Sequence, residues 1–173
     1  AAAIGLLDQA LAAEPAERAL TNWARANRYA GSGDRQAIRD LVFDGLRRRR
    51  SFGYLGGGDT GRAIMIGALR AAGADAALVF TGEGYAPTAI SAAELELRDL
   101  SAASRSQRLD CPDWLLPHFD VALGDQADEI LTILQTRAPV FLRVNLARID
   151  REAAQARLVE EGIQTLPHQL SPT

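Results

Sequence analysis

Residues 33–51, GDRQAIRDLVFDGLRRRRS, are the stretch around which the rest of the chain is organised. Spacings of three and four place its apolar and small residues on one stripe of an α-helix: Ala37, Ile38, Leu41, Val42, Gly45 and Leu46. Four consecutive arginines, 47–50, close this helix, where cations complement the negative end of its dipole. We therefore expect a core helix with a basic outer side, capped by Ser32 or Asp34.

Composition bounds the class of protein. The chain has 173 residues, 47% of them hydrophobic, which is enough for a real core. Its apolar runs are too short to cross a bilayer and its start does not resemble a signal peptide, so we expect a cytoplasmic protein with no membrane partner. One cysteine and two distant histidines argue against disulfides and against a metal site. The only methionine is Met65, so we take the sequence to be part of a longer chain.

Charge is distributed unevenly along the sequence. The net charge is −3, yet residues 18–50 hold nine arginines against three acids, whereas residues 101–173 hold seven against ten. Phosphates are bound by arginines on a helical face through charge and bidentate hydrogen bonds, which favours nucleic acid as the partner. The candidate contacts are Arg25, Arg28, Arg35, Arg39, Arg47 and Arg50. A solvated helix face is the alternative explanation of the same pattern.

The first hundred residues read as helices only. Apolar spacing predicts helices near 4–13, 15–30 and 61–72, and a short helical segment at 75–81. Residues 51–61, SFGYLGGGDTG, read as a glycine-rich loop, and Ser91 to Glu94 has the form of a capping box. Residues 101–110 are small and polar, so we place a linker at 103–110.

The spacing of apolar residues changes from helical to alternating in the part of the sequence after the linker. We expect helices opening at Pro112 and covering 127–136, and then a strand at 139–146, PVFLRVNL, whose alternation puts Phe141, Arg143 and Asn145 on one face. A helix at 151–161 and a second strand at 163–168 complete a parallel pair. Arg143 is a further candidate RNA contact, since an aromatic, a cation and an amide side by side can stack on and read an unpaired base. The alternative is a face covered by a helix.

No catalytic constellation is evident. Gly56 to Gly61 fits G-x-G-x-x-G, but a dinucleotide site needs a strand before the glycines, and a helix ending in arginines precedes them here. Cys111 lies among acids and a proline rather than beside a base, and His118 and His168 lack partners. We expect an interhelical loop in the first case and packing or surface residues in the others.

Two parts of the sequence resemble a known family. RYAGSGDRQAIRDLVFDGLRRRRSF, residues 28–52, resembles the NusB-like helical domain of bacterial RsmB (Sun/Fmu) type RNA cytosine-5 methyltransferases. CPDWLLPHF, TRAPVFLRVN and EEGIQTLPHQLSPT are similar to the segment that precedes the catalytic core of these enzymes. The resemblance implies methylation of ribosomal RNA with S-adenosylmethionine. However, the cofactor motif and both catalytic cysteine motifs of the family are absent, so we expect no cofactor and no activity in this part.

The resemblance completes the expected fold. It implies a mainly α protein: a NusB-like helical bundle at 1–102, and at 111–173 an incomplete α/β segment, RRM- or ferredoxin-like. The expected function is recognition of ribosomal RNA for the methyltransferase, with a ribosomal or antitermination protein as a further partner. Two alternatives remain: a stand-alone NusB-like antitermination factor, and a nucleotide-binding enzyme that uses Gly56 to Gly61.

Overall fold

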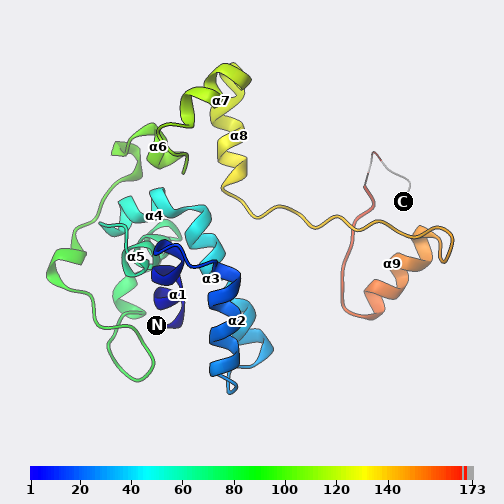
Figure 1. The fold of residues 1–173 in the computed structure, drawn as a ribbon, viewed down its shortest axis with the longest axis horizontal. Coiled ribbons are helices and arrows are strands. Elements are labelled where there is room, and N and C mark those ends of the chain that lie inside the picture. Colours follow the sequence, from blue (N-terminus) through cyan, green and yellow to red (C-terminus); the bar gives the residue numbers. More distant parts are fainter. Residues whose placement is uncertain (169, 171–173) are drawn as a thin grey trace. The chain divides into compact units, whose positions relative to one another are not determined.

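The computed structural model describes residues 1–168 and 170 and divides the chain into two compact units, 1–137 and 138–173. Each unit is described by itself. The α-helices of the first unit are α1 (Ala2–Leu11), α2 (Ala16–Ala26), α3 (Ser32–Arg47), α4 (Arg49–Gly56), α5 (Gly61–Ala71), α6 (Arg105–Arg108), α7 (Leu116–Leu123) and α8 (Ala127–Leu134) (Figure 1). The second unit holds α9 (Arg151–Glu160). Short 3₁₀ turns are η1 (Ala76–Leu78), η2 (Ala92–Leu95), η3 (Leu100–Ala102) and η4 (Gly124–Gln126).

The main core lies among α1 to α5. Side chains from four of these helices are fully buried there: Leu7, Val42, Phe52, Ile64 and Ile66. Burying one such side chain contributes about 1.5–3 kcal/mol, so these five positions hold the helices together. No helix among the described residues is long and apolar enough to cross a membrane.

The predicted core helix is shorter and less buried than its pattern indicated. Val42 and Gly45 are buried and Ile38 packs against the core, but Ala37 and Leu41 are exposed, so the buried stripe is narrower than the pattern indicated. The helix ends at Arg47, and α4 begins two residues later. Its N-cap is Gly31, whose N–H donates to the Asp34 carboxylate at 3.0 Å, so Asp34 contributes to the cap from inside the helix.

The glycine-rich loop prediction is wrong for residues 51–56, which belong to α4. Glycine allows α4 and α5 to pack backbone against backbone: a Cβ on Gly56 would lie 1.8 Å from the carbonyl oxygen of Ala63, and one on Gly67 would lie 1.8 Å from that of Phe52. Only Gly57, at φ +88°, ends the helix in the left-handed region. The glycines therefore serve a helix contact more than a loop.

Residues 72–110 are mostly irregular, held by specific contacts. The predicted capping box is confirmed, with the Ser91 N–H donating to Glu94 at 2.9 Å. Arg62 of α5 donates to both oxygens of Glu94 at 2.6 and 3.0 Å, tying this segment to the core. Residues 103–110 are not separated from the core: they contain α6, and Leu109 and Ser106 are buried. The chain divides into its two compact units after residue 137.

A smaller core joins α6 to the two following helices. Leu109, Cys111 and Leu131 are buried together, with Leu115 and Phe119 packed against them. The helix predicted to open at Pro112 begins at Leu116, because residues 112–115 form a turn whose carbonyls accept the first helical hydrogen bonds. The predicted helix near 127–136 is confirmed as α8.

The strand predictions in the second unit are wrong. Neither 139–146 nor 163–168 forms a strand, and no ladder hydrogen bonds join the two segments within the described residues. Alternation of apolar and polar residues selects a two-faced strand only when a partner backbone is present, and two short segments offer too few bonds. The helix between them is confirmed: the Asp150 carboxylate accepts from the Ala153 N–H at 2.7 Å, and Gly162 follows at φ +78°.

Candidate nucleic-acid interface

A groove of about 740 Å³ runs between α2 and α3. Its walls combine apolar side chains with four of the predicted arginines, and its lining is Leu20, Thr21, Trp23, Ala24, Arg25, Arg28, Ala30, Ser32, Arg35, Gln36 and Arg39. We call it the arginine groove. The turn at 27–31 brings the arginines of the two helices to one site, and it is fixed by the amide of Asn27, which donates to the Trp23 carbonyl at 2.8 Å.

Three arginines of the groove carry uncompensated charge. The side chains of Arg25, Arg28 and Arg35 are exposed and form no ion pair or hydrogen bond with another residue that the structure describes. Arg39 differs, because its guanidinium pairs with Glu17 at 2.5 Å and lies over the Phe43 ring. Three free guanidiniums on one groove have the charge and hydrogen-bond donors that phosphate oxygens require.

An aromatic residue missed by the sequence reasoning lies in the turn beside the groove. The Tyr29 side chain is 82% exposed, and its hydroxyl donates to the side-chain oxygen of Asn27 at 3.0 Å. An exposed ring next to free arginines offers a stacking surface for an unpaired base. The dipeptide Arg28-Tyr29 was the available signal in the sequence.

The arginines at the α3–α4 junction, 47–50, do not extend the groove as one basic surface. Arg47 pairs with Asp44 at 3.2 Å, and Arg50 pairs with Asp113 at 2.6 Å and donates to Ser106 at 3.2 Å. Arg48 turns inward over the Phe52 ring, 4.3 Å from its centroid. Of the four, only Arg49 is exposed and has no such contact among the described residues.

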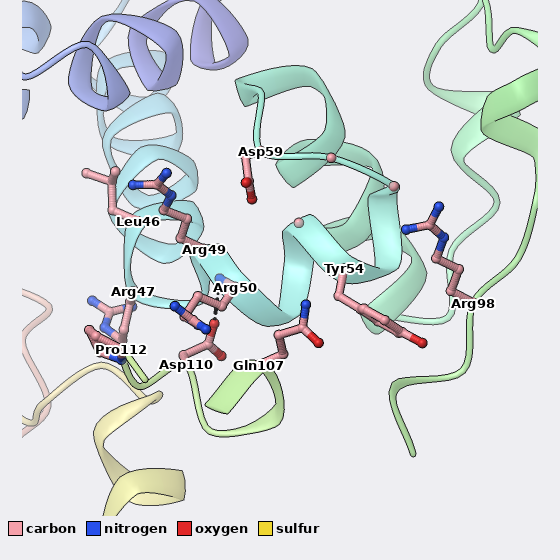
Figure 2. A pocket seen from close by; sticks show the side chains of 13 residues that line it. Leu46, Arg47, Arg49, Arg50, Tyr54, Asp59, Arg98, Gln107, Asp110 and Pro112 are labelled. Carbon is pink, nitrogen blue, oxygen red and sulfur yellow. Dashed lines mark hydrogen bonds between the residues drawn. The ribbon is translucent and has the colours of Figure 1, made fainter. Parts of the chain in front are cut away.

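Asp110 explains why the junction turns inward. Its carboxylate accepts from the N–H groups of Arg50 and Ser51 at 2.8 Å each and from the Ser51 hydroxyl at 2.7 Å, so it caps α4 from a distant segment (Figure 2). Burial raises the pKa of Asp110, while these hydrogen bonds and the Arg48 charge oppose that rise. Asp110 therefore fixes the backbone of Arg50, while the side chains of the predicted contacts Arg47 and Arg50 pair with Asp44 and Asp113.

Arg143 belongs to the second unit, whereas the groove belongs to the first. It is exposed and lines a shallow hollow with residues 144–147. Phe141 makes an edge-to-face contact with His168, their ring centroids 5.3 Å apart. The expected flat face of Phe141, Arg143 and Asn145 does not form, because no strand orders the three side chains.

The remaining candidate sites show no catalytic arrangement. Cys111 is buried, and burial raises the pKa of its thiol, which disfavours the reactive thiolate. The glycine amides are occupied: the N–H groups of Gly57 and Gly58 donate to the Gly53 carbonyl, and that of Gly61 donates to Asp8 at 2.7 Å. No group of three metal-ligating side chains occurs among the described residues.

One comparison with known proteins gave a match. Residues 111–173 match the family model described as the ferredoxin-like domain of RsmF/B-like methyltransferases. This match supports a relationship of the second part of the chain to the rRNA methyltransferases. The family model covers none of the helical part before residue 111. Searches of curated proteins and of solved structures found no significant match.

Proposed function

We propose that this chain is the RNA-recognition part of an S-adenosylmethionine-dependent rRNA cytosine-5 methyltransferase, and that it does not methylate RNA by itself. The single observation that carries the assignment to methyltransferases is the match of residues 111–173 to the RsmF/B-like ferredoxin-like domain. The helical part would then be the NusB-like domain that its sequence resembles.

The arginine groove supports the RNA-binding half of the proposal. Arg25, Arg28 and Arg35 have no internal partner among the described residues, so their charge is available to phosphates. Tyr29 beside them adds an exposed aromatic face. Contacts of this kind bind the backbone and stack on bases, which suits unpaired or looped RNA.

The residues of the chain support the second part of the proposal, that it does not methylate RNA by itself. Cytosine-5 methylation in the family uses a cysteine that adds to the base, and the only cysteine here is buried. No glycine-rich cofactor motif of the family occurs in the sequence. S-adenosylmethionine and the nucleophile would therefore belong to the catalytic domain of the whole enzyme. The match over 111–173 also favours this proposal over a stand-alone antitermination factor.

Two assays on the same preparation test the proposal. The chain is incubated with a small-subunit rRNA transcript, and retention on a filter is measured beside transfer of tritium from methyl-labelled S-adenosylmethionine. We expect salt-sensitive retention without incorporation of tritium. Incorporation by this chain would contradict the assignment as a recognition part, and absence of retention at 50 mM salt would contradict RNA binding.

A further inference from the structure

A second hollow, of about 580 Å³, lies along α4 and shares no lining residue with the arginine groove. It lies within the first unit, between the α3–α4 junction, the end of α4 and two later segments of the chain (Figure 2). Its lining is Leu46, Arg47, Arg49, Arg50, Gly53, Tyr54, Gly57, Gly58, Asp59, Arg98, Gln107, Asp110 and Pro112. We call it the α4 hollow. Its volume falls within the range of about 300–1,000 Å³ of small-molecule sites.

The charge of the α4 hollow is positive after its internal pairs are removed. Arg47 and Arg50 pair with carboxylates outside the lining, and the charge of Asp110 is opposed by that of Arg48, which also lies outside the lining. Arg49 and Arg98 form no ion pair or hydrogen bond with any residue in the described part of the chain. Two unpaired guanidiniums therefore face the hollow against one remaining carboxylate, that of Asp59.

An aromatic ring and an amide complete the lining. The Arg98 guanidinium lies 5.9 Å from the centroid of the Tyr54 ring and against Gly57, where a Cβ would come within 3.8 Å of it. Figure 2 shows Arg98 and Arg49 on opposite sides of the hollow, with Tyr54 and Gln107 between them. The Gln107 side-chain oxygen accepts from Ser104, which leaves its NH₂ group as a donor.

From this arrangement we propose that the α4 hollow binds a nucleoside monophosphate unit. The base stacks on Tyr54 beside Arg98, and the phosphate is bound by Arg49 or Arg98. The Gln107 amide adds a hydrogen-bond donor for the base or the sugar. The proposal is independent of the arginine groove. The unit comes either from a strand of RNA or from a free nucleotide, because both present the same base and phosphate.

Equilibrium dialysis with labelled uridine 5′-monophosphate and with an octamer of uridine tests the site. The comparison uses the wild-type chain, the double variant Arg49→Gln/Arg98→Gln and the control Arg18→Gln, which removes an exposed arginine outside the hollow. We expect at least tenfold weaker binding in the double variant and unchanged binding in the control. Circular dichroism confirms that each variant is folded.

The choice of probe identifies the source of the unit. Binding of the octamer alone, weakened at least tenfold in the double variant, supports the site with an RNA strand as its ligand. Binding of the monophosphate with equal sensitivity supports it with a free nucleotide. Binding of neither probe, or equal loss in the control, overturns the proposal. The double variant leaves the arginine groove intact. A negative result for the α4 hollow therefore does not contradict the proposed function.

Discussion

The arginines of the groove and those of the α3–α4 junction are the same residue type, 12 to 25 positions apart, yet the fold uses them in opposite ways. Arg25, Arg28 and Arg35 face solvent without partners among the described residues, whereas Arg47 and Arg50 hold carboxylates and Arg48 packs on Phe52. Arg47, Arg48 and Arg50 stabilise the fold, and the groove arginines are available to a ligand. The count of charges in the sequence does not distinguish these roles, because the partners of Arg50 are more than fifty residues away.

The largest effect is expected at the acid that organises the junction. Asp110→Ala removes three hydrogen bonds at the start of α4 and leaves Arg48 without its nearby charge. We expect a loss of about 2–4 kcal/mol in the free energy of unfolding, measured by urea titration. Asp59→Ala is the control, since Asp59 makes no such bond with a described residue, and it should change stability by less than about 0.5 kcal/mol. Equal stability of the two variants would contradict the claim that Asp110 stabilises the start of α4.

Neighbouring arginines of the junction give the next comparison. Arg50→Gln loses the contacts with Asp113 and Ser106, and we expect its melting temperature to fall by more than about 2 °C, an effect limited by the exposure of Asp113. Arg49→Gln removes the same charge without a partner and should leave the melting temperature within about 2 °C. Equal shifts in both variants would show that the junction responds to charge alone.

A pH titration tests the contribution of another arginine that has an internal carboxylate partner, Arg62. Its hydrogen bonds, together with those from the N–H and hydroxyl of Ser91, lower the pKa of Glu94 from 4.5 to about 2. Because the carboxylate has the lower pKa when folded, its stabilisation is present above pH 4.5 and is lost as the pH falls toward 2. We expect Glu94→Gln to be less stable by about 1 kcal/mol at pH 7 and to approach the wild type near pH 2. A difference that does not depend on pH would contradict this account.

The smallest effect on stability is expected in the groove itself. The groove variant, Arg25→Gln/Arg28→Gln/Arg35→Gln, removes three charges that make no internal contact with described residues. Its free energy of unfolding should change by less than about 0.5 kcal/mol, measured by urea titration. A loss of stability comparable to that of Asp110→Ala would show that the groove arginines also stabilise the fold. It would contradict the distinction between them and the junction arginines.

Local signals in the sequence predicted much of the helical part, and contacts between distant residues account for the rest. Spacing and caps predicted α8, α9 and the Ser91–Glu94 box, since these depend on neighbours within four residues. The break at Arg48 depends on Asp110, and the helical state of residues 51–56 depends on the close approach of α5 to Gly56. Residues 139–146 have the alternating pattern of a strand, but no other described segment pairs with their backbone.

The candidate site was predicted in composition but not in geometry. Counting arginines found Arg25, Arg28 and Arg35, which lie together, and also Arg47 and Arg50, which are engaged elsewhere. Tyr29 and Arg98 were missed, because a lone aromatic or arginine in an irregular segment has no periodic signature. Arg143 stays a prediction, since it lies in the other unit.

The central claim is that the groove arginines bind the RNA backbone, and a salt series tests it most directly. Anisotropy of a labelled small-subunit rRNA hairpin is measured from 50 to 300 mM salt with the wild-type chain, the groove variant and a control variant of equal charge. The control is Arg18→Gln/Arg148→Gln/Arg157→Gln, three exposed arginines whose side chains also lack partners in the described part of the chain.

The account predicts that the groove variant binds at least tenfold more weakly at 50 mM salt. Its plot of log affinity against log salt should be shallower by about 2, as expected when three contacts with unpaired RNA are lost. The control should retain both the affinity and the slope of the wild type within a factor of two to three. Equal weakening of the two variants would contradict the claim, because binding would then follow net charge and not the groove.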